Sequence, residues 1–585
     1  MRERREDVCY TGMKRDVRNR LRLITLLLFG VALLLATRLY FVQLVHGRDY
    51  ALKADRQYVN SSQELFDRGS IYFTRKDGTL ISAASLETGF IISIQPSKVK
   101  NAELTYEKIT SLTPIERSVW DKALARTEDP YEILARRVQE GAGKKVAELQ
   151  LAGVTVSRER WRIYPADASA AQTIGFIGYN NDNVIGGHYG LERYYNDVLN
   201  RDSVGLFGNF FAELFANLDS VVVDAHASRQ GDLITTIEPV VQRKADEVIR
   251  HVQEQYGSTE TGVIIMDPKT GEIIALDTVP HFNANNSGKE DATYFGNPLV
   301  EHQYEFGSIM KPITMTAGLD AGVIQPDSTY NDTGCITVNK KTFCNYDLKP
   351  RGPATPMQQI LSQSLNVGAA YIATRLGHER FRHYFQELGF GEETGIDLPS
   401  EVAGNIQNIK TSPRDVEYDT ASFGQGIAET PVQMIKALGA LANEGSVVTP
   451  HLVRAKKLES GIARTLTWEK GKQVFSPKAT EETTRMLVEV VDVKLGNGKV
   501  KIPEMSVAAK TGTAQIAGPN GKYAEDQYFH SFMGYFPAYE PRFIILLYTK
   551  QPHGVKYASE TLTQPFFELT HFLINYYNVP PDRAQ

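Results

Sequence analysis

The chain has 585 residues and a formal net charge of −5, with 42% hydrophobic residues, 23% charged residues and three cysteines. A single hydrophobic core rarely extends beyond about 250–300 residues, so this length predicts at least two domains. The composition is typical of a globular protein, and its slightly acidic balance argues against a protein that binds nucleic acid through a basic surface.

The N-terminal part combines a basic tail with a long apolar run. Residues 1–22 contain eight Arg and Lys residues against four Asp and Glu residues, and residues 23–45 are almost wholly apolar, with Arg38 as the one charge. At a rise of about 1.5 Å per residue, this run would extend about 30–35 Å, which is enough to cross a bilayer. The basic flank predicts a cytoplasmic tail, so the chain after residue 45 would lie outside the cytoplasm.

A cleaved signal peptide is the alternative interpretation of this segment. The apolar run is long for the hydrophobic region of a signal peptide, and no clear cleavage site with small residues follows it. No later segment approaches the length of apolar sequence that a membrane span needs. We therefore expect an uncleaved signal anchor and a single transmembrane helix.

Residues 46–240 mix charged loops with short strand-like runs at 70–73, 89–95 and 221–224. A charged helical stretch is expected from about residue 117 to residue 151. The segment contains no metal-ligand cluster, phosphate-binding loop or nucleophile motif, which favours a binding or spacer domain.

The run from Leu206 to Leu218 has apolar residues at spacings of three and four. This periodicity predicts an amphipathic helix with Phe207, Phe211 and Phe215 on its apolar face. Two interpretations are open. The face packs against its own chain, or it is partly exposed and docks a membrane partner.

From about residue 261 onward, strand-like runs occur at both ends of the region, with helical patterns between them. This order predicts an α+β fold in which one antiparallel sheet is flanked by helices. Pro268-Lys269-Thr270-Gly271 is a turn signal between two apolar runs and predicts a hairpin. The expected strands are residues 262–267, 272–276, 506–516, 530–536 and 543–549, and the expected helical regions are residues 308–390 and 430–445.

Cys335 and Cys344 flank a short run centred on Asn339, Lys340 and Lys341. A hairpin here would bring the two sulfurs within bonding range, and an oxidising compartment would favour a disulfide. A disulfide and two free thiols are both compatible with the sequence.

Three short polar motifs occur in order in the C-terminal region, and the first is Ser308-Ile309-Met310-Lys311. Positions i and i+3 of a helix share a face, so Ser308 and Lys311 would touch. Serine is a weak nucleophile unless a neighbour takes its proton, and a desolvated lysine with a lowered pKa can do so. The N-terminus of a helix also favours negative charge that develops at the reacting centre.

The second motif, Ser364-Leu365-Asn366, places a hydroxyl and a carboxamide two residues apart on a predicted loop, where both can face one cleft. Ser364 is a candidate for relaying a proton between Lys311 and a leaving amine. The amide of Asn366 is a candidate for holding both the lysine and the substrate backbone.

The third motif, Lys510-Thr511-Gly512-Thr513, lies inside a strand-like run. An exposed edge strand can pair with an extended peptide, and Gly512 would let the peptide backbone approach closely. Lys510 and the hydroxyls of Thr511 and Thr513 suit a carboxylate. The backbone N–H groups of Ser308 and Thr513 are candidates for an oxyanion hole.

Each motif alone occurs by chance in many chains and is then only a surface helix pair, a loop or a turn. All three in this order, with the third on an expected strand and all behind an expected membrane anchor, indicate a serine acyl-transfer site. Motifs of these three kinds occur together in β-lactamases and penicillin-binding proteins.

The sequence resembles a class B penicillin-binding protein well beyond these motifs. Tyr304-Glu305-Phe306-Gly307 is similar to the family's lead-in to its nucleophile, except that Phe306 stands where the family usually has proline. The likeness covers nearly the whole chain after residue 20. It includes Arg38-Leu39-Tyr40 with Gln43, Arg68-Gly69-Ser70-Ile71 with Asp77-Gly78, Gly190-Leu191-Glu192, Phe423-Gly424-Gln425-Gly426-Ile427, Thr430-Pro431-Val432-Gln433-Met434, and Ser531-Phe532-Met533-Gly534 with Pro537.

The resemblance implies a domain plan and a location. A cytoplasmic tail (residues 1–22) and a transmembrane signal anchor (23–45) would precede a pedestal or dimerisation-type domain (46–240) and a transpeptidase domain (241–585). The last two would lie on the periplasmic side of the inner membrane. Arg68 and Glu192 would support the fold and partner contacts of the pedestal.

The resemblance also implies a mechanism. Ser308 would attack the D-Ala–D-Ala bond of a donor stem peptide of peptidoglycan with Lys311 as the base. The side-chain amine of a neighbouring stem would then take the acyl group. β-Lactams would leave a slow acyl-enzyme. No cofactor or metal is expected, and the expected partners are stem peptides, β-lactams, a membrane lipid-II polymerase and other cell-wall proteins.

Other functions fit the sequence less well. A β-lactamase is generally much shorter, and a D,D-carboxypeptidase is usually anchored at its C-terminus, whereas residues 578–585 are polar. A non-catalytic β-lactam receptor would need several spans, and a divisome scaffold would be expected to lose Ser308 or Lys311. Class A relatives carry a glycosyltransferase domain with a catalytic Glu-Asp-x-x-Phe pattern before the transpeptidase domain. The region before the motifs lacks this pattern, with residues 128–132 the nearest run, so a monofunctional enzyme is expected. Asn366 in the second motif favours the cell-division branch.

Overall fold

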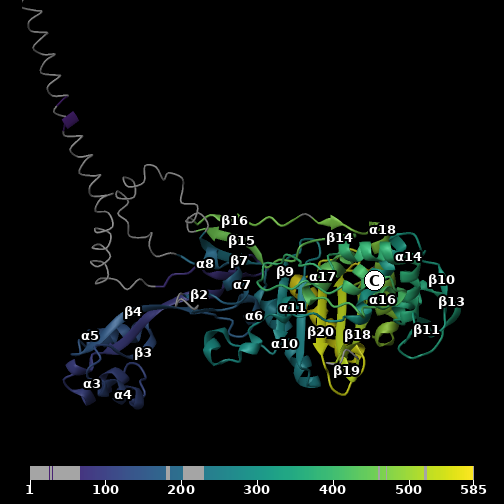
Figure 1. Cartoon of the computed structure of the whole chain (residues 1–585). Coiled ribbons are helices and arrows are strands. Elements are labelled where there is room, and N and C mark those ends of the chain that lie inside the picture. Colours follow the sequence, from purple (N-terminus) through teal and green to yellow (C-terminus); the bar gives the residue numbers. More distant parts are fainter. Residues whose placement is uncertain are drawn as a thin grey trace, which may run out of the picture. The chain divides into compact units, whose positions relative to one another are not determined.

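The computed structural model describes residues 66–179, 185–201, 230–458, 461–469, 471–518 and 523–583, together with Leu26, Phe29 and Gly30. The chain divides into two compact units, residues 1–66 and residues 67–585, and the second unit holds the elements discussed below (Figure 1). Among the described residues, no helix has the length and apolar character needed to cross a membrane. Almost all of the predicted anchor, the run 206–218 and the predicted strand at 221–224 lie outside the described residues.

A seven-stranded sheet joins the beginning of this unit to a later part of the chain. The long strand β2 pairs with β1 over its first residues and with β3 and β4 over the rest, and β7 lies parallel to β1. Strand β15 pairs with β7 and with β16. The strands are β1 (Ile71–Thr74), β2 (Leu80–Ile94), β3 (Glu132–Gln139), β4 (Val154–Ile163), β7 (Gly231–Thr235), β15 (Val453–Leu458) and β16 (Ala463–Thr465).

The expectation of one helical stretch from 117 to 151 is wrong. The structure has helix α4 (Arg117–Ala125), then strand β3, then helix α5 (Glu140–Glu148). Strand β3 inserts Leu134 and Val138 into a small core around Trp120, which also takes up side chains from β2 and from α3 (Ala102–Thr110). Two apolar side chains four residues apart fit one face of a helix, so the charged segment resembled a helix although pairing with β2 makes it a strand.

The second sheet has five strands in the order β18-β19-β20-β8-β9, and every neighbouring pair is antiparallel. This confirms the predicted hairpin, the three late strands and the predicted α+β class. The third motif lies on β18, at one edge of the sheet. The strands are β8 (Glu260–Met266), β9 (Ile273–Val279), β18 (Ala508–Ala517), β19 (Tyr523–Phe536) and β20 (Phe543–Lys550).

Two hydrophobic cores cover the two faces of this sheet, because alternate residues of a strand point to opposite sides. Val263 and Ile265 of β8 pack in the core formed with α10 (Pro239–Tyr256) and α20 (Thr563–Tyr577). Ile264 and Met266 pack in the larger core on the other face. The helices of that core include α12 (Lys311–Asp320), α14 (Asn366–Glu387), α17 (Pro431–Gly439) and α18 (Pro477–Glu489).

The helical expectation for 430–445 is confirmed by α17, whereas the one for 308–390 holds only at its two ends. Residues 329–356 form four short strands, β10 (Thr329–Asp332), β11 (Cys335–Val338), β12 (Lys341–Cys344) and β13 (Gly352–Pro356). Asn339 and Lys340 both have positive φ, which is the backbone of the tight turns that join two-residue hairpins. A disulfide links Cys335 to Cys344 across this β11–β12 hairpin, so the open question about the two thiols is answered.

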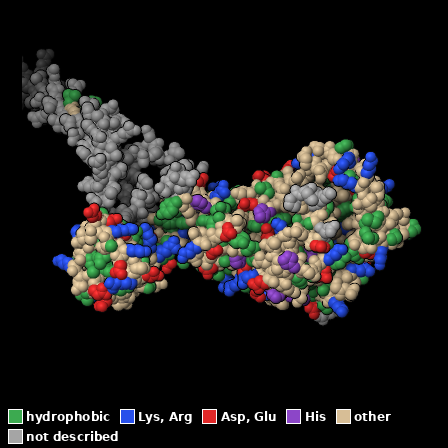
Figure 2. All heavy atoms as spheres, turned by 60° about the horizontal axis from the view of Figure 1, so that its bottom comes forward, with side chains coloured by type: hydrophobic (Ala, Val, Ile, Leu, Met, Phe, Trp, Pro, Cys, Tyr) green, Lys and Arg blue, Asp and Glu red, His purple; other side chains and the backbone are tan. Residues whose placement is uncertain are grey.

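The remaining elements are short and connect the two sheets and their helices. They are α6 (Ala171–Ile174), β5 (Ile177–Tyr179), β6 (Ile185–Gly187), α7 (Gly190–Tyr194), α8 (Asn196–Leu199), α11 (Pro298–Glu301), α13 (Met357–Ser362), α15 (Gln407–Thr411), α16 (Asp415–Ala421), β14 (Ser446–Val447), β17 (Lys472–Gln473) and α19 (Ala558–Thr561). Figure 2 shows charged side chains of both signs interspersed over one face, with hydrophobic side chains in small groups among them.

Three buried charged residues that are far apart in sequence meet in the N-terminal part of the unit, and we call them the arginine–glutamate cluster. Arg68 Nε donates to Glu192 Oε2 at 2.6 Å, and Arg162 Nε donates to Glu192 Oε1 at 2.7 Å. All three side chains are almost completely buried. Burial by itself would raise the pKa of Glu192, but the Arg162 and Arg68 guanidinium groups outweigh it and hold the pKa below its usual range.

Candidate active site

The three polar motifs meet at one cleft of about 1120 Å³ beside the edge strand β18. Ser308 approaches it from the turn before α12, Ser364 from the turn between α13 and α14, and Lys510 from β18. The β11–β12 hairpin supplies another wall, through residues 341–344. Segments from four separate parts of the chain therefore converge around one serine hydroxyl.

The first motif begins as a 3₁₀ turn, η6 (Gly307–Met310), which continues directly into α12. Lys311 is the first residue of α12 and is almost fully buried, and its Nζ donates to Ser308 Oγ at 3.0 Å. Gly307 has a φ of +63°, and a Cβ there would lie 2.8 Å from the carbonyl oxygen of Thr513. Glycine therefore provides both the left-handed backbone and the close approach of the Ser308 turn to strand β18.

The buried amino group of Lys311 has only uncharged hydrogen-bond partners. Besides Ser308 Oγ, its Nζ donates to the Ser364 carbonyl oxygen at 2.6 Å, to Ser364 Oγ at 3.2 Å and to Asn366 Oδ1 at 2.8 Å. Burial lowers the pKa of Lys311 well below its ordinary value, and the positive charge of Lys510 lowers it further. Both causes favour the neutral amine, which is the form that can accept a proton from serine.

The second motif is held in a strained but well-supported turn. Ser364 has a φ of +55°, which is uncommon for a residue other than glycine, and directs its carbonyl oxygen to Lys311. Its hydroxyl lies between the two lysines, 3.2 Å from Lys311 Nζ and 3.1 Å from Lys510 Nζ. Asn366 opens α14, and its Nδ2 donates to the Cys344 carbonyl oxygen at 2.8 Å, so the disulfide-linked hairpin is attached to the site.

In the third motif, Lys510 is also buried, and its Nζ donates to the Thr511 carbonyl oxygen at 2.9 Å. Burial lowers the pKa of Lys510 to about 7. Thr511 and Thr513 line the cleft, and Thr513 Oγ1 accepts a hydrogen bond from the Ala558 backbone N–H at 3.0 Å. Lys510 therefore places a titratable cation beside two threonines at the open edge of the sheet.

The structure shows a packing role for Gly512 in addition to the substrate role predicted from the sequence. A Cβ at this position would collide with Ser531 Oγ and with the carbonyl oxygen of Phe306, both inside the protein. Glycine is thus required for close packing of β18 against the chain that leads to Ser308. The close approach of a peptide substrate to Gly512 stays a prediction.

Phe306, which replaces the family's proline, belongs to an aromatic core behind the nucleophile. Its ring meets Phe529 edge to face at 5.3 Å between centroids and lies 6.2 Å from Tyr304. Its carbonyl oxygen accepts a hydrogen bond from Ser531 Oγ at 2.8 Å. The departure therefore exchanges the rigidity of proline for buried aromatic contacts at the entry to η6.

Several cleft residues were not selected from the sequence. Glu305, Tyr523, Lys341, Lys494 and Lys556 line the cleft along with the three motifs. Four of them belong to no motif, and pattern alone does not show which loop reaches the cleft. Glu305 did carry a signal, because an acidic residue three positions before a nucleophile on a tight turn is within reach of the same cleft.

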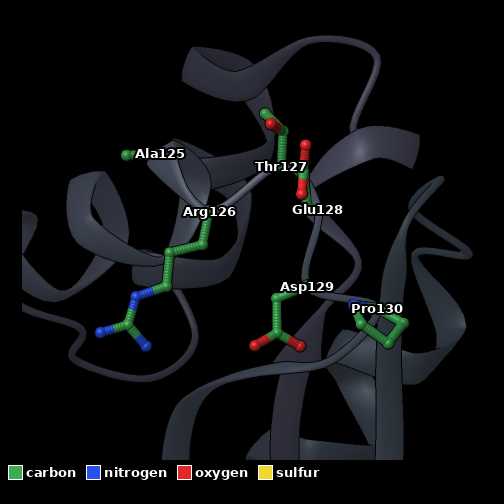
Figure 3. A pocket seen from close by; sticks show the side chains of 6 residues that line it. All are labelled: Ala125, Arg126, Thr127, Glu128, Asp129 and Pro130. Carbon is green, nitrogen blue, oxygen red and sulfur yellow. The ribbon is translucent and has the colours of Figure 1, made fainter.

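A second hollow lies far from these motifs in sequence, in the loop from Ala125 to Pro130. Glu128 and Asp129 belong to residues 128–132, the run nearest to the glycosyltransferase pattern. Figure 3 shows that their carboxylates do not converge on one point. Asp129 Oδ1 accepts from the Tyr131 backbone N–H, and Arg126 pairs with Glu132 at 2.8 Å. These local contacts account for the loop, and no cluster of potential metal ligands occurs among the described residues.

Comparisons with known proteins agree with this geometry. Residues 261–569, more than half of the chain, match the penicillin-binding protein transpeptidase domain, and residues 66–203 match the penicillin-binding protein dimerisation domain. The chain is 28% identical over 569 residues to stage V sporulation protein D of Bacillus subtilis, covering 94% of this chain and 84% of the relative. It is 25% identical over 588 residues to the peptidoglycan D,D-transpeptidase FtsI homolog of Mesostigma viride, covering 96% of each chain.

Among solved structures, penicillin binding protein 3 of Mycobacterium tuberculosis, complexed with aztreonam, superposes with a TM-score of 0.63 at 25% identity. That similarity covers 73% of this chain and 92% of the other. The two matched domains, their order and the cleft built from the three motifs lead to one assignment: the chain belongs to the penicillin-binding protein family, as a class B member with a dimerisation domain and a transpeptidase domain.

Proposed function

We propose that this chain is a peptidoglycan D,D-transpeptidase that cross-links stem peptides through an acyl-enzyme on Ser308 and is covalently inhibited by β-lactams. The observation that carries the proposal is the 3.0 Å contact between Ser308 Oγ and the Nζ of a buried lysine that has only neutral partners. The relatives named D,D-transpeptidases and the aztreonam complex of a similar structure support the same reaction class.

Acylation begins when the neutral amine of Lys311 takes the Ser308 hydroxyl proton while Oγ bonds to the carbonyl carbon of the penultimate D-Ala. The C–N bond to the terminal D-Ala then breaks. The leaving amine needs a proton, and Ser364 Oγ, 3.2 Å from Lys311 Nζ, suits the relay of that proton. The backbone N–H groups of Ser308 and Thr513 are assigned to the oxyanion, which is supported by the packing of Gly307 against Thr513.

The donor peptide is assigned to the open edge of β18, where an extended backbone can continue the sheet. Lys510 and the hydroxyls of Thr511 and Thr513 bind its terminal carboxylate, and Asn366 holds Lys311 and the substrate backbone. Because Lys510 is cationic only below its pKa of about 7, carboxylate binding is expected to weaken at higher pH.

The proposal extends to the rest of the chain. Residues 1–22 form the cytoplasmic tail, 23–45 the single-pass inner-membrane anchor, 46–240 the pedestal and 241–585 the periplasmic transpeptidase domain. The basic and apolar pattern of the N-terminus supports the anchor, and the matches at 66–203 and 261–569 support the two outer domains. A membrane lipid-II polymerase is the proposed partner, with a role in cell division.

The test is the intact mass of the full-length protein after treatment with benzylpenicillin. We expect one covalent adduct on the wild-type protein and none on Ser308→Ala. Ser362→Ala is a matched control, because Ser362 lines the same cleft without contacting Lys311 in the structure. An adduct that persists in Ser308→Ala, or that disappears in Ser362→Ala, would contradict the assignment.

A further inference from the structure

Glu305 is a largely buried carboxylate that lines the catalytic cleft together with Ser308. Its Oε1 accepts from the Gly426 backbone N–H at 3.0 Å, and its Oε2 accepts from the Tyr523 hydroxyl at 2.9 Å. Both donors are neutral, so they orient the carboxylate without balancing its charge. Burial raises the pKa of Glu305, and the two hydrogen bonds oppose the rise.

No Lys, Arg or His of the described residues forms an ion pair with Glu305, which sets it apart from the other acidic residue of the cleft wall. Glu417 also lines the cleft, but it pairs with Arg414. Asp397, which is also buried with only neutral donors, lies outside the cleft, whereas Glu305 faces the cleft and can be reached by a ligand that supplies a positive charge. The cleft thus has an acidic group that is oriented, shielded and free to take a cationic ligand.

The acyl-transfer reaction requires a second substrate with that chemistry. Its nucleophile is an alkyl amine on the acceptor stem, and such an amine is an ammonium ion at neutral pH. The lysines of the cleft, Lys510 above all, suit the carboxylate of the donor and would repel this cation. Glu305 carries the negative charge that would attract the ammonium ion. It lies three residues before the nucleophile, on the segment that enters η6.

We propose that Glu305 binds the ammonium group of the acceptor stem peptide and accepts its proton, an inference that rests on the proposed transpeptidase function. The ammonium transfers one proton to the carboxylate and becomes a neutral amine. The amine nitrogen bonds to the carbonyl carbon of the Ser308 ester while the C–Oγ bond breaks. The second proton passes through Lys311 to Ser308 Oγ, and the protonated Glu305 returns its proton to water.

The experiment measures how the acyl-enzyme divides between water and an amine. The full-length protein is given a benzoyl-D-alanyl thioester as donor and Nα-acetyl-lysine as acceptor, and the hydrolysis and aminolysis products are quantified. For Glu305→Gln we expect the ratio of aminolysis to hydrolysis to fall about 10²-fold, the low end of the usual contribution of a proton-transfer group. Acylation by the thioester and by benzylpenicillin should stay within about threefold of wild type, since these steps do not use an acceptor.

Glu417→Gln is the matched control, because it neutralises a cleft carboxylate that already has a cationic partner. Its product ratio should not change. An unchanged ratio in Glu305→Gln, or a parallel loss of acylation and aminolysis, would overturn the inference, the second result indicating a structural role. If Glu305→Gln does not fold, Glu305→Asp is measured instead. We expect its ratio of aminolysis to hydrolysis to fall several-fold while acylation stays normal, and an unchanged ratio would overturn the inference. A wild-type protein that is not acylated at all would instead refute the proposed function.

Discussion

Two of the clusters of buried charged side chains, the arginine–glutamate cluster and the lysines of the catalytic cleft, differ in how their charge is compensated. In the arginine–glutamate cluster, Glu192 is bound directly by the guanidinium groups of Arg68 and Arg162. In the catalytic cleft, Lys311 and Lys510 are buried near each other and donate only to hydroxyl, carbonyl and amide oxygens. One cluster combines opposite charges, and the other combines like charges.

The pKa values are lowered in both clusters, but this keeps the glutamate charged and favours the neutral form of the lysines. The two arginines lower the pKa of Glu192 and keep it ionised, so the cluster resists protonation. Burial lowers the pKa values of Lys311 and Lys510 and favours their neutral forms, so both groups give up a proton more readily than an exposed lysine does. We expect the first arrangement to serve stability and the second to serve chemistry.

The largest effect is expected at Lys311. Lys311→Ala removes the base, and Lys311→Arg replaces it with a group that does not give up its proton. Both variants should lower the second-order rate constant of acylation by benzylpenicillin by about 10⁴-fold, the upper range for a proton-transfer group. The measurement is the time course of adduct formation by mass spectrometry.

Lys436→Ala is the control for this prediction. Lys436 also has a pKa lowered by burial, but its Nζ donates to the Thr394 carbonyl oxygen away from the cleft. Its removal should leave acylation of the folded protein unchanged. Near-normal acylation by Lys311→Arg would show that the lysine contributes charge and not proton transfer.

The second effect concerns stability. Glu192→Gln leaves two buried guanidinium groups without their carboxylate and should lower the free energy of unfolding by about 3–5 kcal/mol. Since the folded pKa of Glu192 lies below its ordinary value of 4.5, this stabilisation is complete above pH 4.5 and is lost as the pH falls through the folded pKa. Denaturant unfolding at neutral and at acidic pH measures both effects.

In the folded fraction of Glu192→Gln, acylation by benzylpenicillin should be normal, because none of the three charged residues of the cluster lines the cleft. Glu132→Gln is the comparison, since Glu132 pairs with the largely exposed Arg126 and should matter little. A stable Glu192→Gln protein with impaired acylation would reverse the roles that we assign to the two clusters.

The five-stranded sheet and the three motifs could be predicted because the information is local. Strands β8, β9, β18, β19 and β20 contain short runs rich in apolar and β-branched residues, and each motif is contiguous in sequence. By contrast, β3 and the strands β10 to β13 owe their form to partners distant in sequence or to turns with positive φ, such as that at Asn339 and Lys340. Tertiary pairing there overrides the local pattern.

The geometry of the cleft could be predicted only in part. The contact of Ser308 with Lys311 follows from helix periodicity, but the bridging of Lys311 and Lys510 by the Ser364 hydroxyl depends on how three segments pack. The packing role of Gly512 also needs coordinates, because it depends on Phe306 and Ser531, which are distant in sequence. The sequence thus predicts which side chains belong to the catalytic cleft, and packing decides which of them are hydrogen-bonded to one another.

The third effect tests the titration of Lys510. Lys510→Ala should lower acylation by carboxylate-bearing β-lactams by about 10–100-fold, the value of one hydrogen bond to a charged group. In the wild-type protein, the acylation rate constant should fall as the pH rises through about 7, because the cation that binds the carboxylate is lost. Lys510→Arg keeps its charge and should move this decline to higher pH. The same decline in wild type and Lys510→Arg would assign it to another group.

The smallest effect is expected from the disulfide, which is connected to Lys311 through hydrogen bonds of Asn366. The Cys344 carbonyl oxygen accepts from Asn366 Nδ2, and Asn366 Oδ1 in turn accepts from Lys311. Reduction should loosen the β11–β12 hairpin, but the paired strands and the Thr337–Thr342 hydroxyl contact remain, so the hairpin should persist. Weakening one neutral hydrogen bond corresponds to a decrease of about two- to tenfold in the acylation rate constant.

The experiment compares the acylation rate constant of the wild-type protein with and without a thiol-free reductant. The double variant Cys335→Ser, Cys344→Ser should be acylated slowly in both conditions. Equal rates before and after reduction of the wild-type protein would mean that α14 alone positions Asn366, and a loss far beyond tenfold would mean that the hairpin supports the lysines more directly than its contacts indicate.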